Sequence, residues 1–226
     1  MVPRELLDTA ALPGGGTLRL LRRGEEYSIM LGANELMNSR KSGSEQALAE
    51  LAAARLSARR EPQVLIGGLG MGFTLRAALA RFGRDAGIVV AEIVPAVIAW
   101  AKGPLAGVFG GSLADPRVRI EEGDVASLIR PGAGWDAILL DVDNGPDGIT
   151  RESNDRLYSR AGLAATRAAL RPGGILAIWS AAPSSAFTAR LRDAGFAVEE
   201  HVARAARGRG RRDVVWVAAL SPARTR

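Results

Sequence analysis

Short, uninterrupted apolar runs alternate with helix-like patterns along the chain from about residue 61 onward. Runs that are apolar throughout are typical of strands covered on both faces, and strands separated by helices pair in parallel. The chain therefore predicts an α/β fold with a mostly parallel sheet between two layers of helices. The strands are expected at residues 63–68, 87–93, 117–124, 135–143 and 175–180, and the helices at residues 72–82, 95–103, 158–174 and 184–196.

Two further apolar segments close the chain, at residues 197–204 and 213–220, and predict an antiparallel hairpin. The loop between them is too short for the crossover that a parallel connection needs. We therefore expect a seven-stranded sheet that is parallel except for strand 214–220. Trp179 lies at the end of strand 175–180, where core packing is expected rather than a place beside a site.

The first part of the chain has a different pattern. Residues 17–23 and 27–31 predict short paired strands, and residues 42–60 predict a helix. We expect residues 1–60 to form a small β-rich N-terminal extension and residues 61–226 to form the main domain.

The chain contains no cysteine and a single histidine, His201. Disulfides and thiol chemistry are therefore excluded, and no metal site is expected. The first ten residues carry acids without an apolar core, and the longest apolar stretch is broken by Glu92 and Pro95. Neither a signal peptide nor a membrane span is predicted, and a cytoplasmic location is expected.

The net charge is +6, and nearly all of the positive charge is arginine. Basic residues that cluster on one face are typical of nucleic-acid-binding proteins. The arginines of this chain are scattered, except for a group at residues 204–212 that predicts a solvated hairpin loop. A nucleic-acid partner is therefore not expected.

A glycine-rich loop follows the first strand of the predicted sheet, with Gly67, Gly68, Gly70 and Gly72. Such a loop allows a ligand to approach the backbone at the carboxyl end of the strand. The fingerprint of dinucleotide-binding proteins would need a glycine where Phe73 stands, and no P-loop lysine follows. The loop therefore does not match a pyrophosphate site.

Acidic residues follow the next strands in order. Glu92 can accept hydrogen bonds from ribose hydroxyls. Asp124 can accept a hydrogen bond from the exocyclic amine of an adenine, or it can cap a helix. Asp141 comes directly after an apolar strand, as a turn former or as a functional carboxylate. Each residue has a structural alternative, but their succession at one edge of the sheet favours a nucleoside site.

Together these segments resemble the Rossmann-like, S-adenosylmethionine-dependent methyltransferase fold, and within it the spermidine synthase family of aminopropyltransferases. The resemblance is carried by VLIGGLGMGFTLR, VVAEIVPAVIAWAK, EEGDVASLI and WDAILLDVDNGP, with LYS at residues 157–159. The family implies a homodimer and S-adenosylmethionine or its decarboxylated form as cofactor. It implies a catalytic role for Asp141, cofactor contacts from Gly67, Gly68, Gly70, Glu92 and Asp124, and substrate contacts from Asp143, Asn144 and Tyr158.

Some residues depart from the family pattern. By resemblance, Gly70 stands where the family has an Asp that contacts the aminopropyl amine, and Asn144 replaces the second acid of the catalytic loop. The family's Tyr-His-Glu stretch is not recognisable near the start of the predicted helix, where only Glu45 and Gln46 offer polar groups. Asp141 remains as a carboxylate that can orient an amine or accept its proton.

The change at Gly70 bears on the choice of cofactor. An Asp would repel the carboxylate of intact S-adenosylmethionine by about 4 kcal/mol at a separation of about 4 Å and an effective dielectric constant of about 20. Its absence favours intact S-adenosylmethionine, so methyl transfer to a small acceptor such as an amine is the main expectation. The alternatives are aminopropyl transfer from decarboxylated S-adenosylmethionine to a polyamine, and a non-catalytic nucleoside-binding protein.

Overall fold

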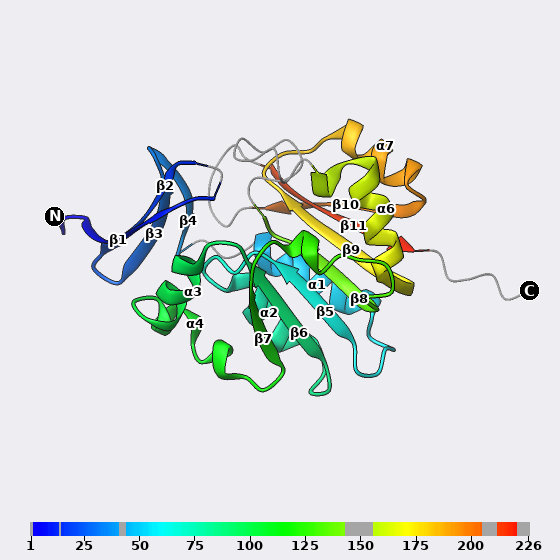
Figure 1. Cartoon of the computed structure of the whole chain (residues 1–226), viewed down its shortest axis with the longest axis horizontal. Coiled ribbons are helices and arrows are strands. Elements are labelled where there is room, and N and C mark those ends of the chain that lie inside the picture. Colours follow the sequence, from blue (N-terminus) through cyan, green and yellow to red (C-terminus); the bar gives the residue numbers. More distant parts are fainter. Residues whose placement is uncertain (1, 14, 41–43, 143–155, 205–211, 221–226) are drawn as a thin grey trace, which may run out of the picture.

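The described part of the chain forms two sheets. A computed structural model describes residues 2–13, 15–40, 44–142, 156–204 and 212–220. In these ranges a small sheet lies at the N-terminal end of the molecule and a large sheet runs through its centre (Figure 1).

The small sheet is a meander of antiparallel strands. It consists of β1 (Glu5–Ala11), β2 (Thr17–Arg23), β3 (Glu26–Leu31) and β4 (Asn34–Asn38). β2 and β3 match the predicted strands. The sequence pattern does not predict β1 and β4, because β1 carries Asp8 at its centre and β4 is short and bounded by asparagines.

The large sheet has seven strands in the order β10-β11-β9-β8-β5-β6-β7. Neighbouring strands from β9 to β7 pair in parallel, whereas β11 is antiparallel to both β10 and β9. The prediction of one antiparallel strand, at residues 214–220, is therefore confirmed. The strands are β5 (Gln63–Gly67), β6 (Gly87–Glu92), β7 (Val118–Glu122), β8 (Trp135–Leu140), β9 (Leu170–Ser180), β10 (Phe196–Arg204) and β11 (Arg212–Leu220).

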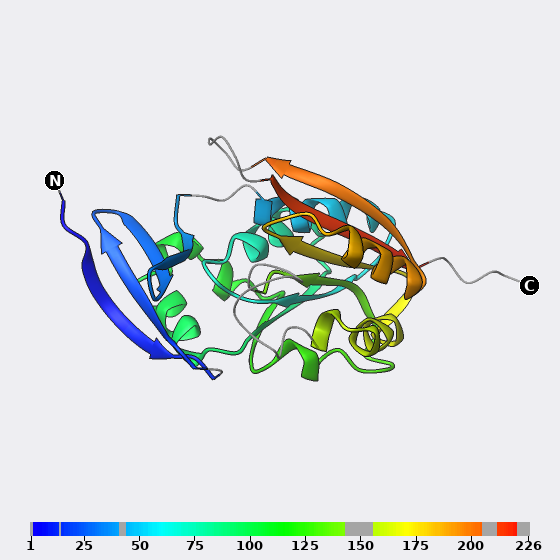
Figure 2. The ribbon, with the colours of Figure 1, turned by 90° about the horizontal axis from the view of Figure 1, so that it is seen from above.

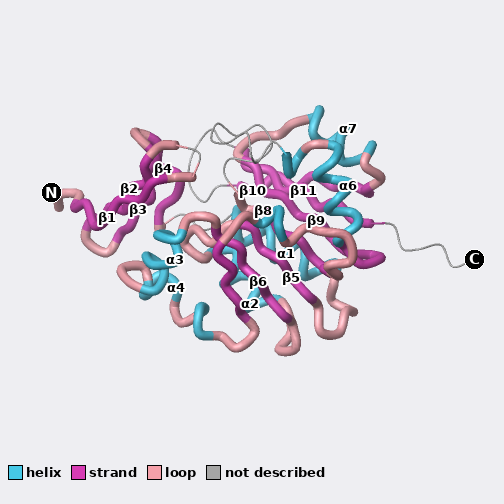
Figure 3. Tube along the Cα trace, viewed as in Figure 1, coloured by secondary structure: helices cyan, strands magenta, loops and turns pink. Residues whose placement is uncertain are grey.

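Helices cover both faces of the large sheet (Figures 2 and 3). One face carries α1 (Ser44–Arg55), α2 (Phe73–Arg81) and α3 (Pro95–Lys102), and the other carries α6 (Arg160–Ala169) and α7 (Ser185–Asp193). Shorter connections are α4 (Ala106–Phe109), η1 (Ser112–Ala114) and η2 (Val125–Ser127). None of the helices in the described ranges is long and apolar enough to cross a membrane.

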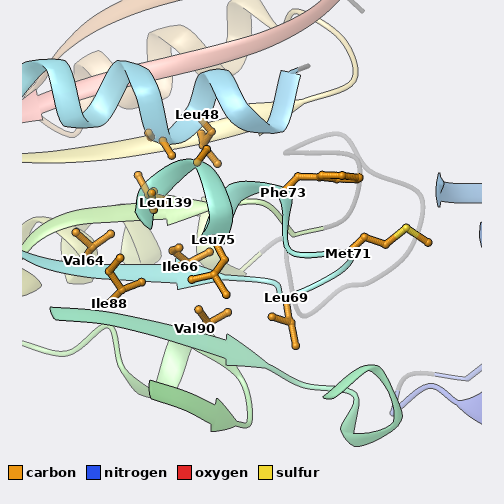
Figure 4. Packing of buried hydrophobic residues seen from close by; sticks show 14 of the residues in the cluster. Leu48, Val64, Ile66, Leu69, Met71, Phe73, Leu75, Ile88, Val90 and Leu139 are labelled. Atoms are coloured by element: carbon orange, nitrogen blue, oxygen red, sulfur yellow. The ribbon is translucent and has the colours of Figure 1, made fainter. Parts of the chain in front are cut away.

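Alternate residues of the central strands face opposite layers of the core. Val64 and Ile66 of β5 pack with α1 and α2, whereas Leu65 between them packs with the α6 and α7 layer. Figure 4 shows Leu48 of α1 and Leu75 of α2 on the same side of the sheet as Val64 and Ile66. Because both faces are buried, the central residues of such a strand form an uninterrupted apolar run, which is the pattern that predicts the fold.

The small sheet is joined to the rest of the molecule by apolar packing and a hydrogen bond. Ile29 is buried in the cluster that includes α1 and α2, and Trp100 Nε1 in α3 donates to Asp8 Oδ2 in β1 at 2.6 Å. Helix α1 packs against α2 and β9. The division into residues 1–60 and 61–226 stays a prediction, and this packing favours a boundary before α1.

The boundary between α6 and β9 differs from the predicted one. Helix α6 ends at Ala169 and β9 begins at Leu170, so Pro172 lies within the strand instead of ending a longer helix. Leu170 pairs with Trp135, and the next pair is Ile175 with Ala137. The register between β9 and β8 therefore shifts, and the residues between Leu170 and Ile175, including Pro172, are accommodated there.

Candidate functional site

A pocket lies at the carboxyl ends of β5, β6, β7 and β8 in the large sheet. The glycine loop, residues 67–72 after β5, contributes to one wall, and the small sheet contributes Leu31 and Met37 to another. The structure brings most of the predicted site residues together, since the pocket is lined by Gly68, Gly70, Glu92, Asp124 and Asp141.

The glycine loop is held tightly between the ends of β6 and β8. Gly68 donates its N–H to the Ala91 carbonyl at 2.9 Å, and the Gly67 carbonyl accepts the N–H of Asp141 at 3.0 Å. Gly68 has φ +94°, and a Cβ there would lie 2.4 Å from the Asp141 carbonyl oxygen. A glycine is therefore required at position 68 for the loop to pass the end of β8. Gly67 ends β5 and is not among the described residues that line the pocket.

Gly70 lies against the small sheet. Its φ is +48°, and a Cβ at this position would come within 2.6 Å of Met37 Cε and 2.9 Å of Met37 Sδ. An acidic side chain would have to displace Met37 and adopt a strained backbone conformation. The apolar side chain of Met37 thus closes the wall of the pocket beside Gly70.

Glu92 ends β6 and is only 7% exposed. Its Oε2 accepts the Leu69 N–H at 3.0 Å, and its Oε1 accepts the Val94 N–H at 2.8 Å. Burial raises the pKa of Glu92, and these backbone hydrogen bonds offset part of the rise. The carboxylate ties the glycine loop to the start of α3, a structural role in addition to the ribose contact that the sequence predicts.

Asp124 is exposed and caps η2. Its side chain accepts the Ala126 N–H at 2.9 Å. The capping role is one of the two alternatives that the sequence leaves open. Asp124 also lines the pocket, so contact with an adenine stays a prediction.

Asp141 follows β8 and is partly buried. Its Oδ2 accepts a hydrogen bond from Thr74 Oγ1 at 2.7 Å. Burial raises the pKa of Asp141 to about 7, the negative charge of Glu45 adds to the rise, and the Thr74 hydrogen bond opposes it. A carboxyl group that titrates near neutral pH is suited to accept a proton from a reacting amine.

Glu45, near the start of α1, places a further carboxylate at the pocket. The Thr74 hydroxyl, which donates to Asp141, lies 3.3 Å from the main-chain oxygen of Glu45. Thr74 therefore lies between the start of α1 and Asp141. From the sequence, Glu45 is only one of two polar residues in the segment where the family's Tyr-His-Glu stretch is not recognisable. Its approach to Asp141 depends on how α1 packs against α2, which no local sequence pattern reveals.

Two aromatic residues take different places. Trp179 of β9 lines the pocket and also packs against the core, so it does flank the site. Tyr158 is 1% exposed and packs edge-to-face on Phe187, with 5.5 Å between ring centroids. It is not among the described residues that line the pocket, and its contact with an acceptor stays a prediction without support from this geometry.

Asp143 and Asn144, the other predicted substrate-binding residues, lie outside the described residues.

Comparisons of sequence identify relatives for part of the chain. No family model matches it. Proteins named polyamine aminopropyltransferase from Mycobacterium tuberculosis and Mycobacterium bovis are 37% identical over 145 residues. The match covers 60% of this chain but only 27% of each relative, so the chain spans about a quarter of their length.

Comparisons of structure cover nearly the whole chain. A spermidine synthase in complex with the transition-state analogue AdoDATO matches with a TM-score of 0.72 and 16% identity, over 94% of this chain and 72% of that one. Spermidine synthase from Thermotoga maritima matches with a TM-score of 0.71 and 17% identity over the same shares. A probable spermidine synthase from Corynebacterium glutamicum matches with a TM-score of 0.63 and 14% identity, over 97% of this chain and 80% of that one.

The chain therefore shares the fold of these spermidine synthases, as the resemblance implies, and part of its sequence resembles polyamine aminopropyltransferases. The main functional expectation, methyl transfer, is wrong, because these relatives are aminopropyltransferases and support the alternative expectation. Glu45 of α1 also lines the pocket, and its charge adds to the rise in the pKa of Asp141 that burial causes.

Proposed function

We propose that the protein is an aminopropyltransferase of the spermidine synthase type, using decarboxylated S-adenosylmethionine and an amine acceptor. The observation that carries the proposal is Asp141, a partly buried carboxyl group beside Glu45 in the pocket, with a pKa raised to about 7. Such a group suits deprotonation of a cationic amine. The sequence relatives and the shared fold support the same activity.

The two ends of the pocket have separate tasks under this proposal. Glu92, held by the N–H groups of Leu69 and Val94, is assigned to the ribose, whose hydroxyls would donate to it, and Asp124 is assigned to the adenine. Gly68 and Gly70 line the pocket, so the glycine loop is assigned to contact with the cofactor. The acceptor amine is assigned to the end of the pocket that contains Asp141.

The chemistry requires a neutral nucleophile. An alkylammonium has a pKa near that of lysine, about 10.4, and must lose a proton before its nitrogen can attack. In the transfer, the amine nitrogen bonds to the aminopropyl carbon, the carbon–sulfur bond breaks, and the sulfonium becomes the neutral thioether of methylthioadenosine. Asp141 accepts the proton that the nitrogen releases, and Thr74 holds the carboxylate in place through its 2.7 Å hydrogen bond.

The remaining assignments stay predictions. The acceptor is a small amine such as a polyamine, the location is cytoplasmic, and the assembly is a homodimer. A nucleoside-binding protein without activity is the alternative function. It would bind the nucleoside but would not convert an acceptor to product.

The test is an assay of the purified full chain with decarboxylated S-adenosylmethionine and a panel of diamines and polyamines. Mass spectrometry should detect methylthioadenosine and an acceptor enlarged by one aminopropyl group in equal amounts. Asp141→Asn should lower kcat by about 100-fold or more while methylthioadenosine still binds. Binding of methylthioadenosine by the wild type without turnover of any acceptor would overturn the proposal in favour of a binding protein.

A further inference from the structure

The walls of the pocket differ in charge where the glycine loop meets helix α1. Resting on the proposed function, we propose that Glu45 determines which form of S-adenosylmethionine the pocket accepts. Its carboxylate attracts the terminal ammonium of the decarboxylated form and repels the carboxylate of the intact form. Selection of the cofactor is thereby assigned to α1 and not to the glycine loop.

The glycine loop presents no charged side chain at this wall. Gly70 lines the pocket, and Met37 lies where a side chain at position 70 would begin, with Cε 2.6 Å from an ideal Cβ. The neighbouring residues Leu69 and Met71 are buried apolar side chains. Among the described residues, a charge that distinguishes a ligand with a carboxylate from one without is therefore provided by another element.

Two of the carboxylates that line the described pocket already serve the backbone. Glu92 accepts the N–H groups of Leu69 and Val94, and Asp124 accepts that of Ala126. Both follow strands on the side of the sheet formed by β6 and β7, where the nucleoside is assigned. Among the described residues that line the pocket, Glu45 and Asp141 are the carboxylates at its α1 side.

Glu45 is held at this place by a rigid helix. Leu48 and Ala49, in the next turn of α1, are completely buried against the large sheet. Thr74 Oγ1 donates to Asp141 Oδ2 at 2.7 Å and lies 3.3 Å from the Glu45 carbonyl oxygen, so the first turn of α1 lies close to Asp141. The Glu45 side chain itself is partly exposed to the pocket.

The two carboxylates influence each other. Both groups line the pocket. Burial raises the pKa of Asp141, and the charge of Glu45 adds to the rise. A ligand ammonium between them relieves this repulsion, whereas a ligand carboxylate adds a further negative charge. The same pair that receives a cation therefore rejects the intact cofactor.

The experiment compares Glu45→Gln with Glu50→Gln, a matched change on the exposed side of the same helix. Calorimetry measures the Kd of decarboxylated S-adenosylmethionine, intact S-adenosylmethionine and methylthioadenosine, which has neither charged group. The wild type should prefer the decarboxylated form over the intact form by about tenfold or more. Glu45→Gln should reduce this preference about tenfold and leave the Kd of methylthioadenosine within about twofold, and Glu50→Gln should change neither value.

The outcomes separate this inference from the proposed function. If the wild type turns over the decarboxylated cofactor and Glu45→Gln keeps the full preference, the inference is wrong and the proposed function stands. If the wild type binds none of the three ligands, the proposed function fails as well. Glu45→Ala provides a second variant, and an equal loss of affinity for all three ligands in both variants would overturn the inference in favour of a structural role.

Discussion

At the scale of single residues, Asp141 makes the stability of the protein depend on pH. Its pKa is raised from 3.8 to about 7 in the folded chain, so the native state keeps a proton that the unfolded chain releases. The corresponding stabilisation is present below about pH 4 and is lost as the pH rises through 7. Asp141→Asn removes the titrating group. We expect the variant to be more stable than the wild type at pH 8, by about 2–4 kcal/mol in urea unfolding, and equally stable near pH 4.

The matched control for this prediction is Asp85→Asn, because Asp85 lies in an exposed turn. Its unfolding free energy should stay within about 0.5 kcal/mol of the wild type at both pH values. A gain in stability for Asp141→Asn that is the same at pH 4 and pH 8 would contradict an electrostatic origin.

Glu92 combines a structural and a binding role, so its removal should affect both measurements. Glu92→Ala leaves the N–H groups of Leu69 and Val94 without their acceptor. We expect the unfolding free energy to fall by about 2–4 kcal/mol and the affinity for methylthioadenosine to fall about tenfold or more. Glu122→Ala is the control, because Glu122 pairs with Glu92 in the sheet register but is exposed. A Glu92→Ala protein with normal affinity would place the nucleoside elsewhere.

The sequence predicts the site residues at the ends of strands better than the site residues that belong to helices. Glu92, Asp124 and Asp141 were expected at one edge of the sheet, because the carboxyl ends of parallel strands meet there. Glu45 and Thr74 belong to different helices, and their approach to Asp141 follows from the packing of α1 against α2. Such contacts between distant segments leave no periodic signal in the sequence.

At the scale of elements, the position of the small sheet depends on its contact with α3. Trp100 Nε1 donates to Asp8 Oδ2 at 2.6 Å, and this bond lowers the pKa of Asp8. Asp8→Ala removes the acceptor at an exposed position, whereas Asp8→Asn keeps a side-chain oxygen. We expect faster hydrogen exchange in β1 for Asp8→Ala, with rates close to the wild type for Asp8→Asn and unchanged rates in β5 and β8. Equal exchange in β1 of all three proteins would show that apolar packing alone holds the small sheet.

The strands and helices of the large sheet are predictable because uninterrupted apolar runs alternate with helix-like patterns along the chain. The edge strands β1 and β4 of the small sheet are not predicted, since Asp8 and the asparagines interrupt their apolar pattern. The end of α6 was misplaced because Pro172 is typical of a helix end, while the structure accommodates it in the irregular start of β9. Tertiary pairing with β8 outweighs the local preference at this place.

At the scale of the whole molecule, function depends on charges that separate elements bring to one pocket. The sequence supports a comparison of single positions, such as Gly70, with a family pattern. That comparison favours methyl transfer because it treats the glycine loop as the only source of the discriminating charge. The folded chain supplies Glu45 from α1 and closes the loop with Met37 from β4. The fold is therefore predictable from local patterns, whereas the reaction requires knowledge of how the elements meet.

The pocket joins the two sheets, so a ligand that fills it should stabilise both. Leu31 and Met37 line it from the small sheet, and Glu92 and Asp141 line it from the large sheet. Methylthioadenosine at about 100 times its Kd should raise the unfolding free energy by about 2.7 kcal/mol. Hydrogen exchange should slow in β3, β4 and the glycine loop together, while the distant α7 provides the unaffected reference. Protection of the glycine loop without protection of β3 and β4 would mean that the small sheet does not take part in binding, and the assignment of Met37 to the ligand wall would then be wrong.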